Sequence, residues 1–292
     1  MKYINKNNLN HQDKIKDYYN STQFDYSFIW NWGLKTTPSL HFGYYDEKAN
    51  KHEQAIFRVN EVLADWANVT EGTTILDAGC GLGNASLWLA QNRKAKVTGI
   101  TLVQKQVDTA YKLAKKQNIN GAEFLVADYL NTPFEDNSFD VVWACEALCH
   151  APDKSLFYKE AFRILKPGGR LVIAENLRPT RPMSEDKEQF LHEIFDAWAI
   201  PDLDTLEEHQ NHAFKSGFIN FNYKDVTKNV WISYKNLRKI VKQLKPLAYV
   251  LNTFKLVPKL RYHNYLQSGR QADAIEQGIF TYAHLLMEKP SN

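Results

Sequence analysis

Apolar and polar residues follow two different periods along this chain, and the changes between them outline its elements. From about residue 53 the period is helical, and four apolar residues of "EQAIFRVNEVLADWA" share one face: Ile56, Val59, Leu63 and Trp66. The short apolar run "TTILDA" then predicts a buried strand. Further helices are expected at 84–91, 104–117 and 154–165, and further strands at "AKVTGIT", "AEFLVA", "FDVVWA" and "RLVIAE".

This alternation of strands and helices predicts an α/β fold. Successive strand–helix units build a doubly wound, mostly parallel sheet with helices on both faces. We expect residues 53–176 to form this core and residues 1–52 to form a helical N-terminal lid segment. Proline and glycine in "KPGG" end the last helix of the core and precede its fifth strand.

The pattern changes after residue 176. Residues 177–217 have a helical period with many polar and aromatic side chains, which predicts an inserted helical cap. The runs "FINFNYKDV" and "GIFTYAHLLMEK" have strand character. Residues 218–292 are therefore expected to complete the sheet, interrupted by a helical insertion at about 230–276.

Composition and charge exclude several classes of protein. Hydrophobic residues make up 44% of the 292, and 36 basic and 33 acidic side chains give a net charge of +3. The charges are interspersed, so a nucleic-acid partner is not indicated, and the Lys-rich stretches at 112–116 and 235–245 are interpreted as solvated faces. No apolar run approaches the roughly 20 residues of a membrane span. The sequence leaves the oligomeric state open, including a homo-oligomer.

The termini and cysteines suggest a location. The first 14 residues, "MKYINKNNLNHQDK", lack the apolar centre of a secretory signal. Cys80, Cys145 and Cys149 have the spacing of neither a zinc site nor a disulfide framework. A reducing, cytoplasmic location is therefore expected.

The stretch "ILDAGCGLGNAS" at residues 75–86 indicates a ligand site. Its glycines, Gly79, Gly81 and Gly83, follow the first strand, and ligands of open α/β sheets bind at the carboxyl ends of the strands. Glycine permits a sharp turn and lets a ligand approach backbone N–H groups. A dinucleotide fingerprint is disfavoured, because Asn84 replaces its third glycine and Thr101 ends the second strand where an acidic residue would bind ribose.

Several motifs in order resemble those of class I S-adenosylmethionine-dependent methyltransferases. They are "ILDAGCGLGNAS", "VTGITLVQKQ" and "VADYLNTPFEDNSFDVVWACEALCHAPDKSLFYKEAFRILKPGGRLVIAEN". The likeness is greatest to the branch of sterol, tocopherol and related small-molecule methyltransferases. It covers residues 72–176 in detail and 18–46 and 218–288 weakly. It implies a Rossmann-like methyltransferase fold, with S-adenosylmethionine as cofactor and S-adenosylhomocysteine as product.

The resemblance also implies which residues contact the cofactor. Asp77 and the three glycines would line its methionine part, and Thr101, Leu102 and Gln106 would lie near its ribose. Many members of the wider family carry an acidic residue at the position of Thr101. The variant "GITL" belongs to the sterol and tocopherol branch.

The adenine and sulfur ends of the cofactor are assigned in the same way. Asp128 would accept a hydrogen bond from the adenine amino group, and Tyr129 would lie beside the ring. The backbone of Cys145 would pass close to the methionine part of the cofactor. Tyr18 or Tyr19, in the N-terminal segment, would approach the cofactor.

The methyl transfer itself needs few catalytic groups. The protein mainly has to align two reactants and exclude water, and a base is required only if the acceptor loses a proton. In "CEALCHAP", Glu146 and His150 are four residues apart and would share a face if this segment were helical. We therefore expect a proton-accepting or acceptor-orienting pair. Alternatively, Glu146 braces the loop and His150 only packs locally.

Aromatic residues suggest an apolar acceptor. Aromatic faces can bury an apolar molecule or stabilise a cation, although these rings could also simply pin the segment to the core. The residues expected to line the acceptor pocket are Tyr18, Trp30, His41, Phe42, Tyr44, Phe195, Trp198 and Trp231. His209 and His212 are three apart, but no further ligand completes a metal site, so none is predicted.

The sequence thus predicts transfer of a methyl group from S-adenosylmethionine to a small lipophilic acceptor. Carbon is the expected site of methylation, on an isoprenoid-like or natural-product-like molecule. One alternative is an O- or N-methyltransferase of a small metabolite that uses His150 as base. Another is a non-catalytic protein that binds S-adenosylmethionine.

Overall fold

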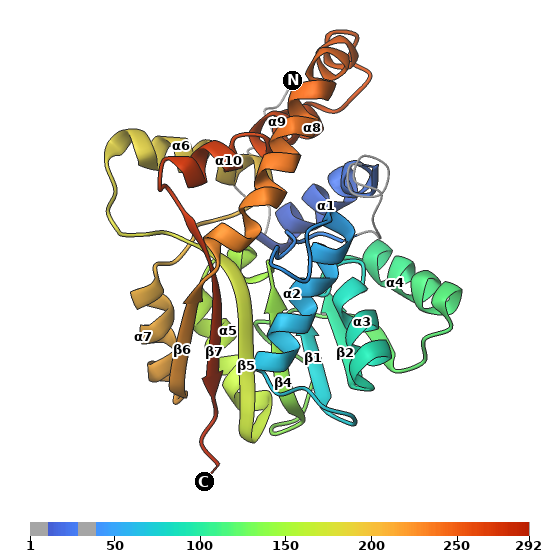
Figure 1. Ribbon diagram of the computed structural model, residues 1–292, viewed down its shortest axis with the longest axis vertical. Helices are drawn as coiled ribbons and strands as arrows, with labels where there is room; N and C mark the ends of the chain where they lie inside the picture. The colour runs from blue at the N-terminus through green and yellow to red at the C-terminus, as the bar shows by residue number, and fades with distance from the viewer. Residues whose placement is uncertain (1–10, 29–38, 292) are drawn as a thin grey trace, which may run out of the picture.

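A computed structural model describes residues 11–28 and 39–291 and contains one seven-stranded sheet (Figure 1). Its strands are β1 Thr74–Ala78, β2 Lys96–Thr101, β3 Ala122–Val126, β4 Phe139–Cys145, β5 Leu165–Leu177, β6 Ile219–Asp225 and β7 Thr281–Glu288. The strand order is β3-β2-β1-β4-β5-β7-β6. Strands β1 to β5 are parallel, and β7 runs antiparallel to both of its neighbours. The predicted α/β fold with a mostly parallel sheet is confirmed.

The helices occupy both faces of this sheet and the space beyond its carboxyl edge. They are α1 His11–Phe28, α2 His52–Trp66, α3 Asn84–Arg93, α4 Gln104–Gln117, α5 Lys154–Ile164, α6 Glu185–Trp198, α7 Leu206–Ser216, α8 Thr227–Thr253, α9 Lys259–Ser268 and α10 Gln271–Glu276. A short 3₁₀-helix, η3, covers Leu148–His150. No described helix is both long and apolar enough to cross a membrane.

Alternate residues of the buried strands enter two separate cores. Ile75 of β1 packs in the core that contains Val59 of α2, whereas its neighbour Leu76 packs in the core that contains Phe157 of α5. This follows from the two-residue period of a strand, whose side chains point alternately to opposite faces. Both faces of β1 are therefore dry, which explains why the neighbours Ile75 and Leu76 are both apolar instead of alternating with polar residues.

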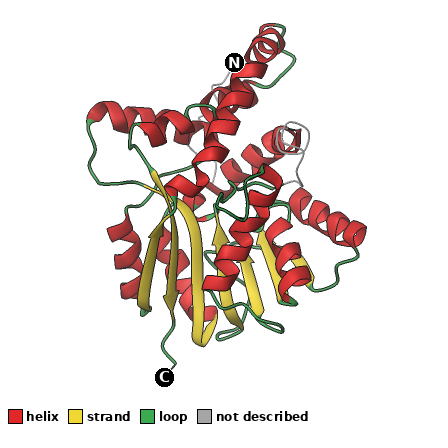
Figure 2. Ribbon diagram, in the orientation of Figure 1, coloured by secondary structure: helices red, strands yellow, loops and turns green. Residues whose placement is uncertain are grey.

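The segment after β5 divides between two places. Helix α6 lies beyond the carboxyl edge of the sheet, together with α8, α9 and α10 (Figure 2). Helix α7 instead lies along the sheet beside α5 and β6, because Ala213 and Phe218 are buried in the α5 core. Within 177–217, where a helical cap was expected, the first helix covers the edge and the second supports the sheet.

Strand β5 begins five residues earlier than its sequence indicates. Phe139 of β4 pairs with Leu165, and Val141 pairs with Arg170, so residues 166–169 bulge out of the ladder. Gly168 has a φ of 75°, a left-handed conformation that glycine adopts without strain. The glycines of "KPGG" thus form a bulge inside the strand rather than a loop before it.

Candidate active site

The carboxyl ends of β1, β2 and β4 surround a cavity of about 800 Å³, which we call the glycine-loop cavity. It lies where the strand order reverses about β1, since β2 and β4 flank that strand on opposite sides. Helix α1 and residues 39–41 close it from above. The predicted site residues that line it are Tyr19, His41, Asp77, Gly79, Gly81, Thr101, Leu102, Gln106, Tyr129, Cys145, Glu146 and His150.

The glycine loop leaves its backbone open to this cavity. Gly79 and Gly81 have φ values of 87° and 52°. A Cβ on Gly79 would lie 2.5 Å from the Cβ of Ala147, and one on Gly81 would lie 2.9 Å from Leu40 Cδ1. Gly83 does not line the cavity, because a Cβ there would lie 2.7 Å from Ala110 Cβ, between α3 and α4. Its role is close helix packing.

Asp77 supplies a buried carboxyl group at the floor of the cavity. Its side chain is buried, and Ser86 Oγ donates a hydrogen bond to Asp77 Oδ2 at 2.5 Å. Burial raises the pKa of Asp77 to about 6, although the bonds from Ser86 lower it. A cationic ligand group at this place would favour the ionised form.

Gln106 presents an unused donor to the same cavity. Thr101 Oγ1 donates to Gln106 Oε1 at 2.5 Å, which fixes the amide with its Nε2 group buried. Within the described residues Nε2 has no hydrogen-bond partner. Leaving a buried donor unpaired costs about 1–3 kcal/mol, which a ligand oxygen would recover. The hydroxyl groups of a ribose have the chemistry required, so these residues fit the expected cofactor.

Of the two neighbours Asp128 and Tyr129, only Tyr129 faces the glycine-loop cavity. Tyr129 lines the cavity and donates from its hydroxyl to Ala147 O at 2.9 Å. Asp128 does not line it; its carboxylate accepts from Gln12 Nε2 at 2.6 Å and from Leu130 N at 2.9 Å. Helix α1 thus meets the core at the residue assigned to adenine.

A second cavity of about 590 Å³, the aromatic cavity, adjoins the first. Tyr19, Leu40, Glu146 and His150 line both and so form the junction between them. The other walls come from α6 and the residues after it, from the end of β5, from Phe42 and Cys149 earlier in the chain, and from Gln271 and Phe280 later in it. They are Phe42, Cys149, Glu175, Asn176, Ile194, Phe195, Trp198, Ile200, Leu203, Gln271 and Phe280.

The structure brings three of the residues expected around the acceptor into this cavity: Phe42, Phe195 and Trp198. His41 instead lines the glycine-loop cavity. Trp30 lies outside the described residues.

Three further expected residues lie outside both cavities. Tyr18 is buried, and its hydroxyl accepts from Asn264 Nδ2 at 3.1 Å. Tyr44 stacks on His284 with ring centroids 5.7 Å apart. The guanidinium of Arg238 lies 5.6 Å from the ring centroid of Trp231 on α8. In these positions the rings join the N-terminal segment and α8 to the core.

Glu146 does not share a helical face with His150. It has a φ of 51° between β4 and η3, and this turn directs its side chain to the junction of the cavities. Its Oε1 accepts from Phe42 N at 2.8 Å and from Tyr282 Oη at 2.7 Å. Burial raises the pKa of Glu146 to about 8, despite both of these bonds.

His150 is held between a tyrosine and a carbonyl. Its Nδ1 lies 3.2 Å from Ala199 O, which can only accept, so Nδ1 carries the proton. Its Nε2 lies 2.9 Å from the hydroxyl of Tyr19, which is therefore the donor. Burial lowers the pKa of His150 to about 4, so the ring is neutral at pH 7.

Two polar residues were not predicted from the sequence: Glu175, which lines the aromatic cavity, and Tyr282, whose hydroxyl donates to Glu146. Glu175, at the end of β5, accepts from the backbone N–H groups of Cys149 at 2.9 Å and Asn176 at 3.0 Å. Burial raises the pKa of Glu175 to about 7. An acidic residue at the carboxyl end of a core strand is a signal that could have identified it. Tyr282 in β7 has no such signal, because only the pairing of β7 with β5 places it.

Comparison with known proteins identifies the family of this chain. The family described as a methyltransferase domain matches residues 76–173. 24-Methylenesterol C-methyltransferase 3 of Arabidopsis thaliana is 30% identical over 287 residues, which cover 94% of this chain and 78% of that protein. 2-Methyl-6-phytyl-1,4-hydroquinone methyltransferase of Synechocystis sp. is 33% identical over 215 residues, covering 71% of this chain and 66% of the relative. The crystal structure of the [4+2]-cyclase SpnF has the same fold, with a TM-score of 0.76, 21% identity, and coverage of 97% of this chain and 98% of that one.

The unused donor of Gln106 predicts a measurable loss. Gln106→Leu should weaken S-adenosylhomocysteine binding by about 1–2 kcal/mol, or 5- to 30-fold, because the ligand loses one buried hydrogen bond. Isothermal calorimetry measures this. Gln104→Leu, two residues earlier and exposed on α4, is the matched control and should bind normally. Equal affinities for both variants would contradict the assignment.

The raised pKa of Glu146 predicts how stability depends on pH. The folded chain retains a proton that the unfolded chain releases near the ordinary pKa of about 4.3, so the free energy of unfolding falls as pH rises from about 5 to 8. Glu146→Gln should remove this part of the fall. Urea unfolding of both proteins at several pH values measures this. From about pH 5 to 8, the free energy of unfolding of the variant should rise relative to that of the wild-type protein by at least about 1 kcal/mol. A difference that stays constant with pH would refute the raised pKa.

Proposed function

The chain belongs to the class I S-adenosylmethionine-dependent methyltransferases, and we propose that it methylates a small lipophilic acceptor at carbon. Acceptors of this kind include isoprenoid-like and natural-product-like molecules with a carbon–carbon double bond. The observation that carries the proposal is the junction of the two cavities. There the half-buried carboxyl group of Glu146 faces a chamber walled mainly by apolar and aromatic side chains.

In this proposal the glycine-loop cavity holds the cofactor. S-adenosylmethionine, when bound, supplies an electrophilic methyl group on a positively charged sulfur. Gly79 and Gly81 would admit its methionine part next to the backbone, with Asp77 near its ammonium group. Gln106 Nε2 would donate to the ribose. Tyr19 and Leu40, which line both cavities, would keep water from the reacting atoms.

The aromatic cavity would hold the acceptor. Its side chains from Ile194 to Leu203, with Phe42 and Phe280, offer apolar and aromatic surface. Among the described residues that line it, the acidic ones are Glu146 and Glu175, and none is lysine or arginine. An alkene that accepts a methyl cation becomes positively charged. An ionised carboxylate and nearby aromatic faces would stabilise that charge, and Glu146 could later receive the proton that leaves.

The environment of His150 argues against a direct role as base. Its Nε2 already accepts a hydrogen bond from Tyr19, and Nδ1 is turned toward Ala199 O. A ring with a pKa of about 4 is also a weak base at neutral pH. The second candidate function, methylation of a hydroxyl or amine, would require the proton to pass through Tyr19 to His150. The hydrogen bond between Tyr19 and His150 at the junction is the observation that favours it.

The two functions are separated by the product. The protein is incubated with S-adenosylmethionine carrying a ¹³C-labelled methyl group and with lipid extracts. Mass spectrometry finds the labelled product, and its ¹³C chemical shift distinguishes a methyl group on carbon from one on oxygen or nitrogen. A methyl ether or methylamine product would overturn the proposal.

Substitutions at the junction should then rank in a defined order. Glu146→Gln keeps an oxygen that can accept from Phe42 N and Tyr282 but removes the charge, so single-turnover rates should fall by about 10²–10³-fold. His150→Ala should slow the reaction by less than about tenfold, since no proton passes through the ring. Glu53→Gln on the exposed side of α2 is the control. The reverse order, with His150→Ala the more damaging, would favour a heteroatom acceptor.

The pH dependence gives an independent check. If Glu146 acts as a carboxylate, kcat/KM for the cofactor, which reports the free protein, should rise with pH and reach half of its plateau near pH 8. A positive charge bound nearby lowers a carboxyl pKa, so the rise in kcat should lie at lower pH. Both rises should disappear in Glu146→Gln. Rates that are flat with pH in the wild-type protein would contradict this role.

A further inference from the structure

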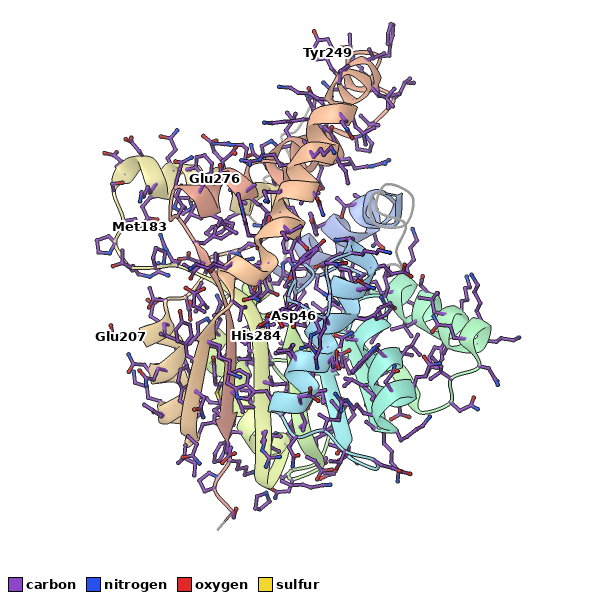
Figure 3. The ribbon with its side chains drawn as sticks, in the orientation of Figure 1. Asp46, Met183, Glu207, Tyr249, Glu276 and His284 are labelled. Carbon is purple, nitrogen blue, oxygen red and sulfur yellow. The ribbon has the colours of Figure 1, made fainter. Side chains whose placement is uncertain are left out.

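Helices α8 and α9 form a hairpin that projects beyond the rest of the fold. Figure 1 shows the end of α8 and the start of α9 standing clear of α6, α10 and α1. Tyr249, near the tip, points away from the body in Figure 3. At its base the hairpin is anchored, because α9 packs on α6 and α1 and Asn264 donates to Tyr18 Oη. We refer to residues 239–261 as the hairpin tip.

The hairpin tip exposes an unusual amount of apolar surface. Tyr249, Phe254 and Leu256 are 63%, 70% and 67% exposed. Other large apolar residues there are more than a third exposed: Leu247, Val250 and Leu260. Residues 247, 250 and 254 follow helical spacing and share one side of α8. A water-facing helix end seldom gathers such side chains without a partner.

Charge is also concentrated in this part of the chain. Residues 226–272 contain ten lysines and arginines and no aspartate or glutamate. The rest of the protein has 26 basic and 33 acidic residues, a net charge of −7. Lys239, Lys242 and Lys245 are exposed on α8 and form no ion pair within 4 Å among the described residues. The protein is therefore electrically polarised, with its positive end at the hairpin.

We propose that the hairpin tip docks the protein on an anionic lipid surface. The lysines would approach the lipid headgroups, while Leu247, Val250 and Phe254 would insert among the upper acyl chains, as in interfacial amphipathic helices. The negative remainder of the protein would be repelled, which fixes the orientation. A nucleic acid would match the charge but would leave the apolar side chains in water, so lipid is the better match.

This surface stands next to the acceptor site. Helices α6 and α1, on which α9 packs, carry Phe195, Trp198 and Tyr19 of the aromatic cavity. Docking would hold that cavity near the membrane, where a lipophilic acceptor is dissolved. This consequence rests on the proposed function, whereas the docking itself is tested without cofactor or acceptor.

The test uses vesicles of phosphatidylcholine, alone or with about one third phosphatidylglycerol, and measures co-sedimentation. One variant changes Leu247, Val250 and Phe254 to Ser, and another changes Lys239, Lys242 and Lys245 to Glu. The matched charge control changes Lys112, Lys115 and Lys116 of α4 to Glu, and the matched apolar control is Phe214→Ser, 51% exposed on α7. Unchanged calorimetric affinity for S-adenosylhomocysteine shows that each variant is folded.

We expect the wild-type protein to bind the anionic vesicles at least tenfold more tightly than the neutral ones. About 0.5 M salt should weaken this binding. Each hairpin variant should lose at least tenfold in binding, because each lysine near such a surface adds electrostatic attraction and each apolar residue adds burial. The α4 and α7 controls should stay within about twofold of wild type.

Four results would overturn the proposal. One is no preference of the wild-type protein for anionic vesicles. A second is an equal loss of binding in hairpin variants and controls. A third is a loss in the lysine variant alone, which indicates a purely electrostatic surface such as one for nucleic acid. The fourth is that sedimentation velocity finds a dimer that only the Ser variant dissociates, in which case a second copy of the chain covers the tip.

Discussion

A single carboxyl oxygen of Glu146 joins three parts of the chain that are far apart in sequence. It accepts from Phe42 N in the N-terminal segment and from the hydroxyl of Tyr282 in β7, while the backbone of Glu146 directly follows β4. Phe42 in turn stacks on Tyr234 of α8, with ring centroids 3.9 Å apart. Because a buried carboxyl group is costly unless it is hydrogen-bonded, these donors and the acceptor hold one another in place. The boundary between the two cavities depends on this arrangement.

The two cavities are built in different ways, and this explains how far the sequence could predict them. The glycine-loop cavity comes largely from consecutive motifs between Asp77 and Gln106, so motif spacing located it. The aromatic cavity combines α6, the end of β5 and the residue before β7, and no local pattern records that these segments meet. Glu175 and Phe280 were accordingly missed.

The elements themselves were predictable where periodicity was strong. The helices at 84–93, 104–117 and 154–164 and the buried strands agree closely with the sequence pattern, since burial imposes the period directly. The start of β5 was not predictable, because Leu165 pairs with β4 before a bulge at residues 166–169 that reads as a loop in the sequence. The relation between Glu146 and His150 also escaped prediction, since a left-handed residue interrupts the presumed helix.

Strand β7 runs antiparallel between β5 and β6, and this reversal has a consequence for how such a protein can diversify. The chain leaves the sheet at Val226 and returns at Tyr282, where Val226 N donates to Tyr282 O at 2.9 Å. Everything between these residues is an excursion with adjacent ends. It can be lengthened, shortened or exchanged as a cassette without altering strand register. Since it contains Gln271 and Phe280 of the aromatic cavity as well as the hairpin, an exchange of this excursion would alter one wall of that cavity and the projecting surface together.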